Sequence, residues 1–342
     1  MPISTILANL WRVHRASRNL PLVTRSLPAR ADIEPTTFCN FRCPHCPTAE
    51  DRGAPRVHLS AAGFAAVLDQ LPAVYRLKLV GLGEPPLNPD FFALVREAKR
   101  RRLRVLTTTN GSLLDADRRR ELLACGLDHV NISIDAARPE THARLRPGSD
   151  LEKIGEGIAA LMRERGRRKR PAIRVWHVIQ QESTPELPDL VSLCAECGVD
   201  GLLCTAKLTN FGSASLEETV SLRRALAADL QRVLPEARRH AEAARLEFRC
   251  PDAPPGARSP VDGKPCRWPW GRVFISARGQ VRPCPYAAGP EGLTLGTLVG
   301  PGAEPFAAIW NGERMQALRE QIRTRQNPPF CRACYPGWPV RP

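Results

Sequence analysis

The sequence predicts an α/β protein: a partial (β/α)6 TIM barrel followed by a small C-terminal α+β domain. Six short apolar segments alternate with six longer helical patterns between residues 31 and 245, which predicts a parallel sheet covered by helices. Further along, two short strand patterns meet at Gly279 and precede a helical pattern over about residues 304–324 that is flanked by cysteines. The 342 residues suffice for one large and one small domain.

The predicted strands are short runs rich in apolar residues. They occupy residues 31–36, 76–81, 103–109, 128–135, 172–180 and 199–206. The helices between them begin with capping residues or proline and carry apolar residues at helical spacing. These start signals are Ser60, the pair Asn88 and Pro89, Asp115, Asp150 and Pro185, and the sixth helix covers residues 216–245. Reactive residues of such a sheet gather beyond the carboxyl ends of its strands.

The chain divides into four predicted segments. Residues 1–30 form a helical lead-in, since their apolar residues cluster at near-helical spacing. Residues 31–248 form the barrel domain. Residues 249–265 are rich in Pro and Gly and form a linker, and residues 266–342 form the C-terminal domain.

The composition points to a cytoplasmic protein. No signal peptide or membrane span is visible, so the 12 cysteines are expected to be reduced and available for metal. The net charge of +15 is concentrated partly at residues 99–102 and 167–170, at the ends of predicted helices. No aromatic residues interleave these runs, which argues against nucleic acid. Genomic bias towards arginine together with helix capping is the main interpretation of this charge, and docking of an acidic electron donor of the flavodoxin or ferredoxin type is the alternative.

The most informative motif is Cys39-x3-Cys43-x2-Cys46. Three thiolates within eight residues can hold three irons of a [4Fe–4S] cube and leave the fourth iron open to an outside ligand. Alternatives are a disulfide pair or a zinc site. Zinc normally takes four nearby ligands, and His45 is poorly placed to be the fourth.

This motif resembles that of the radical SAM superfamily, in which the open iron chelates S-adenosylmethionine (SAM). The resemblance implies a SAM-binding [4Fe–4S] cluster at the three cysteines and generation of a 5′-deoxyadenosyl radical. The stretch Gly81-Leu82-Gly83-Glu84-Pro85, at the end of the second strand, resembles the superfamily's GGEP element. By that resemblance Gly81 and Gly83 approach the cofactor, and Glu84 engages its amino group.

Further cofactor contacts are predicted from the same resemblance. Asn110 closes the third strand, and Ser133 lies on the lumen side of the fourth. Arg144 and Arg146 resemble an arginine that meets the cofactor carboxylate. His45 occupies the place of an aromatic residue before the third cysteine and offers a flat face to adenine.

Catalytic residues are harder to assign. Asp135 and Gln180, at the ends of two predicted strands, are candidates in the barrel lumen for a deprotonating base, together with nearby arginines. Cys204, near the end of the sixth strand, could instead donate a hydrogen atom to a substrate radical. Ordinary packing in the core is the alternative for this thiol.

A second cysteine set comprises Cys266, Cys284, Cys331 and Cys334. Four cysteines around a hairpin and a helix match a fully ligated [4Fe–4S] cluster, with tetrahedral zinc as the alternative. The segment resembles the SPASM/Twitch auxiliary domain. Its single-cluster pattern looks most like the dehydrogenase of butirosin biosynthesis, which oxidises an aminocyclitol.

The function expected from these resemblances is a radical SAM oxidoreductase. It would oxidise an alcohol of a sugar or aminocyclitol, a small-molecule substrate, and pass an electron to the auxiliary cluster. Two alternatives stay open: an enzyme that crosslinks a ribosomal peptide, and a redox-neutral epimerase with Cys204 or Cys250 as hydrogen donor. A protein without enzymatic activity that merely holds metal is the last alternative.

Overall fold

A computed structural model describes residues 3–46, 55–205, 216–250, 265–288 and 292–331. Its ten strands form one sheet. They are β1 (Arg30–Ile33), β2 (Arg76–Leu79), β3 (Arg104–Thr109), β4 (His129–Ser133), β5 (Ala172–Val178), β6 (Gly201–Thr205), β7 (Glu247–Arg249), β8 (Arg272–Ile275), β9 (Gln280–Arg282) and β10 (Gly296–Thr297). The order across the sheet is β10-β9-β8-β1-β2-β3-β4-β5-β6-β7. All pairs from β8 through β1 to β7 are parallel, so the main sheet is a partial barrel of the predicted class.

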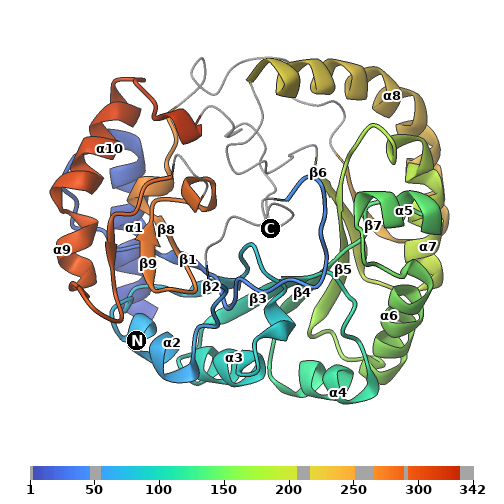
Figure 1. The fold of residues 1–342 in the computed structure, drawn as a ribbon, viewed down its shortest axis with the longest axis horizontal. Helices are drawn as coiled ribbons and strands as arrows, with labels where there is room; N and C mark the ends of the chain where they lie inside the picture. The colour runs from blue at the N-terminus through green and yellow to red at the C-terminus, as the bar shows by residue number, and fades with distance from the viewer. Residues whose placement is uncertain (1–2, 47–54, 206–215, 251–264, 289–291, 332–342) are drawn as a thin grey trace.

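The α-helices lie around the outside of the curved sheet (Figure 1). They are α1 (Ile3–Asn19), α2 (Ala61–Asp69), α3 (Phe91–Arg100), α4 (Ala116–Ala124), α5 (Pro139–Leu145), α6 (Leu151–Arg165), α7 (Leu187–Glu196), α8 (Leu216–Ala243), α9 (Phe306–Trp310) and α10 (Glu313–Arg323). Three predicted caps act as expected. Ser60, Asp115 and Asp150 each accept a hydrogen bond from the backbone three residues on.

The core lies between the sheet and the helices. Alternate strand residues such as Leu77, Val105 and Val175 face the helices and are at most 1% exposed. Burial of such side chains contributes about 1.5–3 kcal/mol each. The intervening residues face the lumen of the barrel and are largely polar, so the lumen is the part of the sheet available for chemistry.

Some features were not anticipated from the sequence. The helix α5 and the short strand β7 were not predicted, and the helix expected over residues 304–324 is two helices, α9 and α10. The predicted hairpin is present as β8 and β9, with Gly279 at a φ of +75°. Strand β8 also pairs in parallel with β1, so the C-terminal domain continues the barrel sheet.

The N-terminal segment connects to the C-terminal domain. The indole nitrogen of Trp310 donates to the carbonyl of Ser26 at 2.8 Å, and that of Trp270 donates to the carbonyl of Pro21 at 2.8 Å. Arg319 is fully buried and donates to the carbonyls of Leu22 and Pro269. Among the described residues, no helix has the length and apolar character needed to span a membrane.

Candidate active site and cofactor pocket

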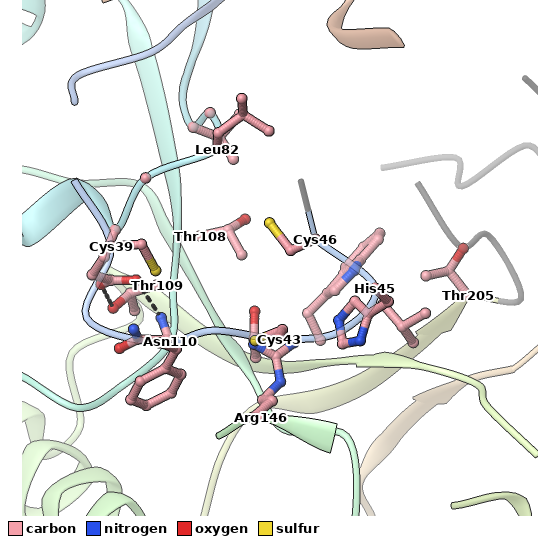
Figure 2. Close-up of a pocket in the computed structure, with 18 residues that line it drawn as sticks. Cys39, Cys43, His45, Cys46, Leu82, Thr108, Thr109, Asn110, Arg146 and Thr205 are labelled. Atoms are coloured by element: carbon pink, nitrogen blue, oxygen red, sulfur yellow. Dashed lines mark hydrogen bonds between the residues drawn. The ribbon is translucent and has the colours of Figure 1, made fainter. Parts of the chain in front are cut away.

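The three clustered cysteines line one cavity of about 230 Å³ at the carboxyl end of the barrel. Cys39, Cys43 and Cys46 lie in the loop that follows β1 (Figure 2). The amide of Cys46 donates to the carbonyl of Cys43 at 2.9 Å, which forms a tight turn between these two cysteines. The amide of Arg42 donates to the carbonyl of Pro147 at 3.1 Å and ties the loop to the end of α5.

The donor set fits an iron–sulfur cluster with one open position. Three thiols share the cavity, and burial raises the pKa of Cys43 to about 11. That thiol is therefore protonated until a metal binds, and cluster assembly must release its proton. His45 is not placed as a further ligand, because its Nε2 lies 3.8 Å from Asp135. In the part of the chain that the structure describes, no three His, Cys, Asp or Glu side chains group closely enough to bind a single metal ion.

The glycine loop after β2 packs directly against the cysteine loop. A side chain at Gly83 would collide with the carbonyl oxygens of Thr36 and Phe38, and one at Gly81 would collide with Glu34. Glu34 accepts a hydrogen bond from the amide of Leu82 at 2.8 Å. The glycines are therefore required by close packing, whatever role they have toward a cofactor.

Glu84 is a buried carboxylate at the edge of the cavity. It accepts hydrogen bonds from the hydroxyl of Thr109 and from the amide of Asn110, the latter at 2.7 Å. Burial raises the pKa of Glu84 to about 7 despite these two donors. A buried carboxylate with this pKa favours a cationic partner such as an amino group.

Asn110 and Ser133 both line the cavity, as the sequence predicted. The side-chain amide of Asn110 donates to the side chain of Asn40 at 2.9 Å and accepts from the hydroxyl of Ser112. These bonds hold Asn110 in one orientation beside the cysteine loop. Ser133 closes β4 on the lumen side.

Of the two candidate arginines, the structure brings Arg146 and not Arg144 to the cavity. Arg146 lines it, is 8% exposed and donates from Nε to Asp135 at 2.7 Å. Arg144 lies at the surface and pairs with Glu182 at 3.2 Å. The helix α5 ends between these residues, so the backbone turns and directs the second side chain inward.

Asp135 supports Arg146 and is not among the residues that line the cavity. It is fully buried and also accepts from the amide of Val178 at 2.9 Å. Burial opposes its ionisation, but Arg146, His177 and His45 together lower the pKa of Asp135. A carboxylate with a lowered pKa and two fixed donors is a poor general base, so this geometry disagrees with the predicted role.

The other two predicted catalytic residues also lie outside the cavity lining. Gln180 follows β5 in a turn where its carbonyl accepts from Thr184 at 2.9 Å. Cys204 faces the helices, since its neighbours on β6, Leu203 and Thr205, face the lumen. Its thiol is buried and forms a hydrogen bond with the thiol of Cys250. A thiol that points away from the lumen cannot donate hydrogen to a substrate there.

Two members of the second cysteine set, Cys266 and Cys284, lie at the opposite end of the hairpin from Gly279. Cys266 precedes β8 and Cys284 follows its antiparallel partner β9, so both lie near the amino end of the barrel strands. The turns after Cys284 and at Cys331 pack against each other. Cys334 lies outside the described residues.

Several cavity residues were not predicted. Trp176, Val178 and Thr205 line the pocket from β5 and β6. Their alternation with buried apolar neighbours was a usable signal for an inward orientation. Nothing in the sequence distinguished them from ordinary lumen packing.

Comparison with known families agrees with this architecture. Residues 33–197 match the radical SAM superfamily, and residues 266–335 match the SPASM iron–sulfur cluster-binding domain. The chain therefore combines a radical SAM domain with an auxiliary iron–sulfur domain. The cofactors that follow are SAM, its [4Fe–4S] cluster and an auxiliary iron–sulfur cluster.

Among curated relatives, the PqqA peptide cyclase of Xanthomonas oryzae pv. oryzae is 27% identical over 319 residues. The match covers 92% of this chain and 82% of the relative. The chain also resembles the structure of Streptococcus suis SuiB bound to precursor peptide SuiA, with a TM-score of 0.63, 16% identity, and coverage of 91% of this chain and 70% of that chain.

The structure of BtrN in complex with AdoMet and 2-DOIA is similar with a TM-score of 0.52 and 14% identity. The match covers 88% of this chain and 89% of BtrN. Both structural likenesses show the fold. They do not single out the Twitch dehydrogenase that the cysteine pattern most resembled.

Proposed function

We propose that the protein is a radical SAM enzyme that modifies a peptide. The observation that carries the radical SAM part is the convergence of three thiols, Glu84 and Arg146 on one cavity. The peptide substrate is supported by the curated relatives named PqqA peptide cyclase, one of which matches 92% of this chain. The sequence-based preference for a sugar or aminocyclitol dehydrogenase rested on the number of cysteines. That number concerns electron transfer and carries no information on substrate shape.

Each cavity residue has a proposed part in holding the cofactor. Cys39, Cys43 and Cys46 would ligate the cluster, Glu84 would accept the amino group of SAM, and Arg146 would face its carboxylate. When bound, this cofactor supplies one-electron cleavage of SAM and abstraction of a substrate hydrogen atom. The protein's task is to orient both partners and exclude water.

The supporting contacts explain how this orientation is kept. Asp135 fixes the guanidinium of Arg146, and Thr109 fixes the carboxylate of Glu84. Both supports come from strand ends or from the residues just after them, which are rigid parts of a barrel. A flavodoxin or ferredoxin as electron donor, and electron transfer to the auxiliary cluster, remain parts of the proposal.

The test begins with anaerobic reconstitution of the full chain, followed by reduction in the presence of SAM. Formation of 5′-deoxyadenosine is expected. Small peptides encoded near the gene, and a panel of sugars and aminocyclitols, are then offered as substrates. Loss of two hydrogen atoms from a peptide, read by mass spectrometry, supports the proposal, whereas oxidation of a sugar and no peptide favours the dehydrogenase.

A further inference from the structure

A second cavity, of about 360 Å³, lies in the lower half of the barrel lumen. Its walls are the inward-facing residues near the amino ends of β1 to β8. Trp176 lines both this lower cavity and the cofactor pocket, so the two are adjacent. Of its 15 lining residues, seven are Arg or Lys and two are acidic.

Four of these arginines form a row across neighbouring strands. Arg272 pairs in register with Arg30, Arg30 with Arg76, and Arg76 with Arg104. Figure 1 shows their strands β8, β1, β2 and β3 side by side. Neighbouring strands lie about 4.8 Å apart, and like charges directly opposite each other destabilise a sheet. Repulsion within such a row of arginines therefore destabilises the folded protein unless an anion neutralises part of the charge.

The two carboxylates of the cavity offset this charge only in part. Asp32 interacts electrostatically with Lys78, Arg272, Arg76 and Arg30, and one carboxylate cannot balance four cations. Glu247 is already paired with Arg174 at 2.8 Å and with Arg249 at 2.6 Å. Within the described ranges, Arg30, Arg76 and Arg272 have no carboxylate within the 4.0 Å of an ion pair. Burial, then repulsion from Arg30 and Arg104, lowers the pKa of Arg76, as expected where positive charge is in excess.

Hydrogen-bond donors are in excess as well. Both ring nitrogens of His129 face guanidinium groups, Arg104 at 2.6 Å and Arg174 at 2.9 Å. A neutral imidazole can accept a hydrogen bond at only one nitrogen. One of these two guanidinium groups therefore finds no acceptor on the imidazole of His129.

Aromatic rings orient two of the cations. The guanidinium of Arg272 lies over the ring of Trp268 at 5.0 Å, and the ammonium of Lys78 lies 5.8 Å from the ring of Trp176. A guanidinium stacked on a ring keeps its N–H edge free for a ligand. The cavity thus combines an excess of positive charge with guanidinium groups that can donate hydrogen bonds and two cations held against aromatic rings.

We propose that the lower cavity is an oxyanion pocket that binds a carboxylate or phosphate group of the substrate. Paired guanidinium forks match the geometry of both groups. An anion held there would place the rest of the molecule against Trp176, toward the cofactor pocket. The inference that the bound anion belongs to the substrate rests on the proposed function. The inference that the cavity binds an anion does not.

The test uses the reconstituted full chain and two anionic probes, pyrophosphate and a triglutamate peptide, with triglutamine as the neutral probe. The variants are Arg76→Gln and Arg30→Gln, and Arg167→Gln, in the exposed turn after α6, is the matched control. Arg272 is left unchanged, because Cys266 is among the groups that interact with its charge. Binding is measured by titration calorimetry and by tryptophan fluorescence.

Wild type and Arg167→Gln are expected to bind at least one anionic probe, at least tenfold more tightly than Arg76→Gln or Arg30→Gln. The preferred probe distinguishes phosphate from carboxylate. Without ligand, both cavity variants should melt no lower than wild type, because a repulsion is removed. Equal affinity in all four proteins, or a preference for triglutamine, would overturn the pocket. A wild type that cleaves SAM but binds neither anion overturns only this inference and leaves the proposed function standing.

Discussion

The two ends of the barrel lumen are built from the same strands but differ in whether their charged groups are paired with opposite charges. At the carboxyl end, charged groups are satisfied: Arg146 pairs with Asp135, and Glu84 accepts two hydrogen bonds. At the amino end, arginines stand in register with few acidic partners. The outward faces of these strands are apolar at both ends. The fold is therefore specified by one set of alternating residues and the chemistry by the other.

The largest expected effect is at the cysteine loop. Cys43→Ala should abolish the SAM-binding cluster and, with it, SAM cleavage, because two thiolates hold the cube too weakly. Loss is measured as iron content, visible absorbance and 5′-deoxyadenosine. Cys125→Ala, which removes a buried thiol at the end of α4, is the control and should keep all three signals. Full SAM cleavage by Cys43→Ala would contradict the ligand assignment.

The second-largest effect tests whether the stability of the protein depends on the buried pair of Arg146 and Asp135 at the carboxyl end of the barrel. Asp135→Asn leaves the guanidinium of Arg146 buried without its counter-ion, which typically costs about 3–5 kcal/mol. Urea unfolding of the metal-free protein measures this free energy. Arg144→Gln, at the exposed pair with Glu182, should change it by less than about 0.5 kcal/mol. Similar losses in both variants would mean that burial of the pair has no special role.

The third prediction concerns how the affinity for SAM depends on pH through the carboxyl group of Glu84. Its pKa of about 7 means that the carboxylate is mostly protonated in acid and must lose a proton to bind an ammonium group. The affinity for SAM should therefore rise by up to about tenfold per pH unit below that pKa and level off above it. Equilibrium dialysis of the reconstituted protein measures this slope. Glu84→Gln should bind weakly with a flat profile, and an unchanged slope in this variant would exclude Glu84 as the titrating group.

The smallest effect is expected at Cys204. Because its thiol faces the helix layer, Cys204→Ala should cost about 1 kcal/mol of stability and leave the product and turnover unchanged. Chemical denaturation and product analysis check the two parts separately. Loss of turnover with normal SAM binding would restore the hydrogen-donor role and the epimerase alternative.

Much of the barrel could be predicted from the sequence because its strands and caps are local signals. The strand at residues 128–135 alternates apolar and polar side chains, and β4 lies within it. Asp115 and Asp150 cap helices through contacts three residues away. The helix α5 and strand β7 were missed because short elements carry too few residues to show a period.

The site was predicted less completely, since orientation is not local. Arg144 and Arg146 are two residues apart, and only the backbone turn at the end of α5 decides which one faces the cavity. Cys204 could have been excluded, because alternation along β6 sends its side chain outward. The in-register row of arginines depends on β8 joining β1 across 242 residues of sequence separation, Arg30 to Arg272, which no local pattern reveals.

The pairing of β8 with β1 also has a consequence for solubility. A chain that ended after β7 would leave the whole backbone edge of β1 open, with its N–H and C=O groups unpaired. Open edges recruit strands from other molecules and start aggregation. The domain that carries the auxiliary cysteines therefore also protects the barrel from self-association, so its removal should yield insoluble material rather than a smaller enzyme.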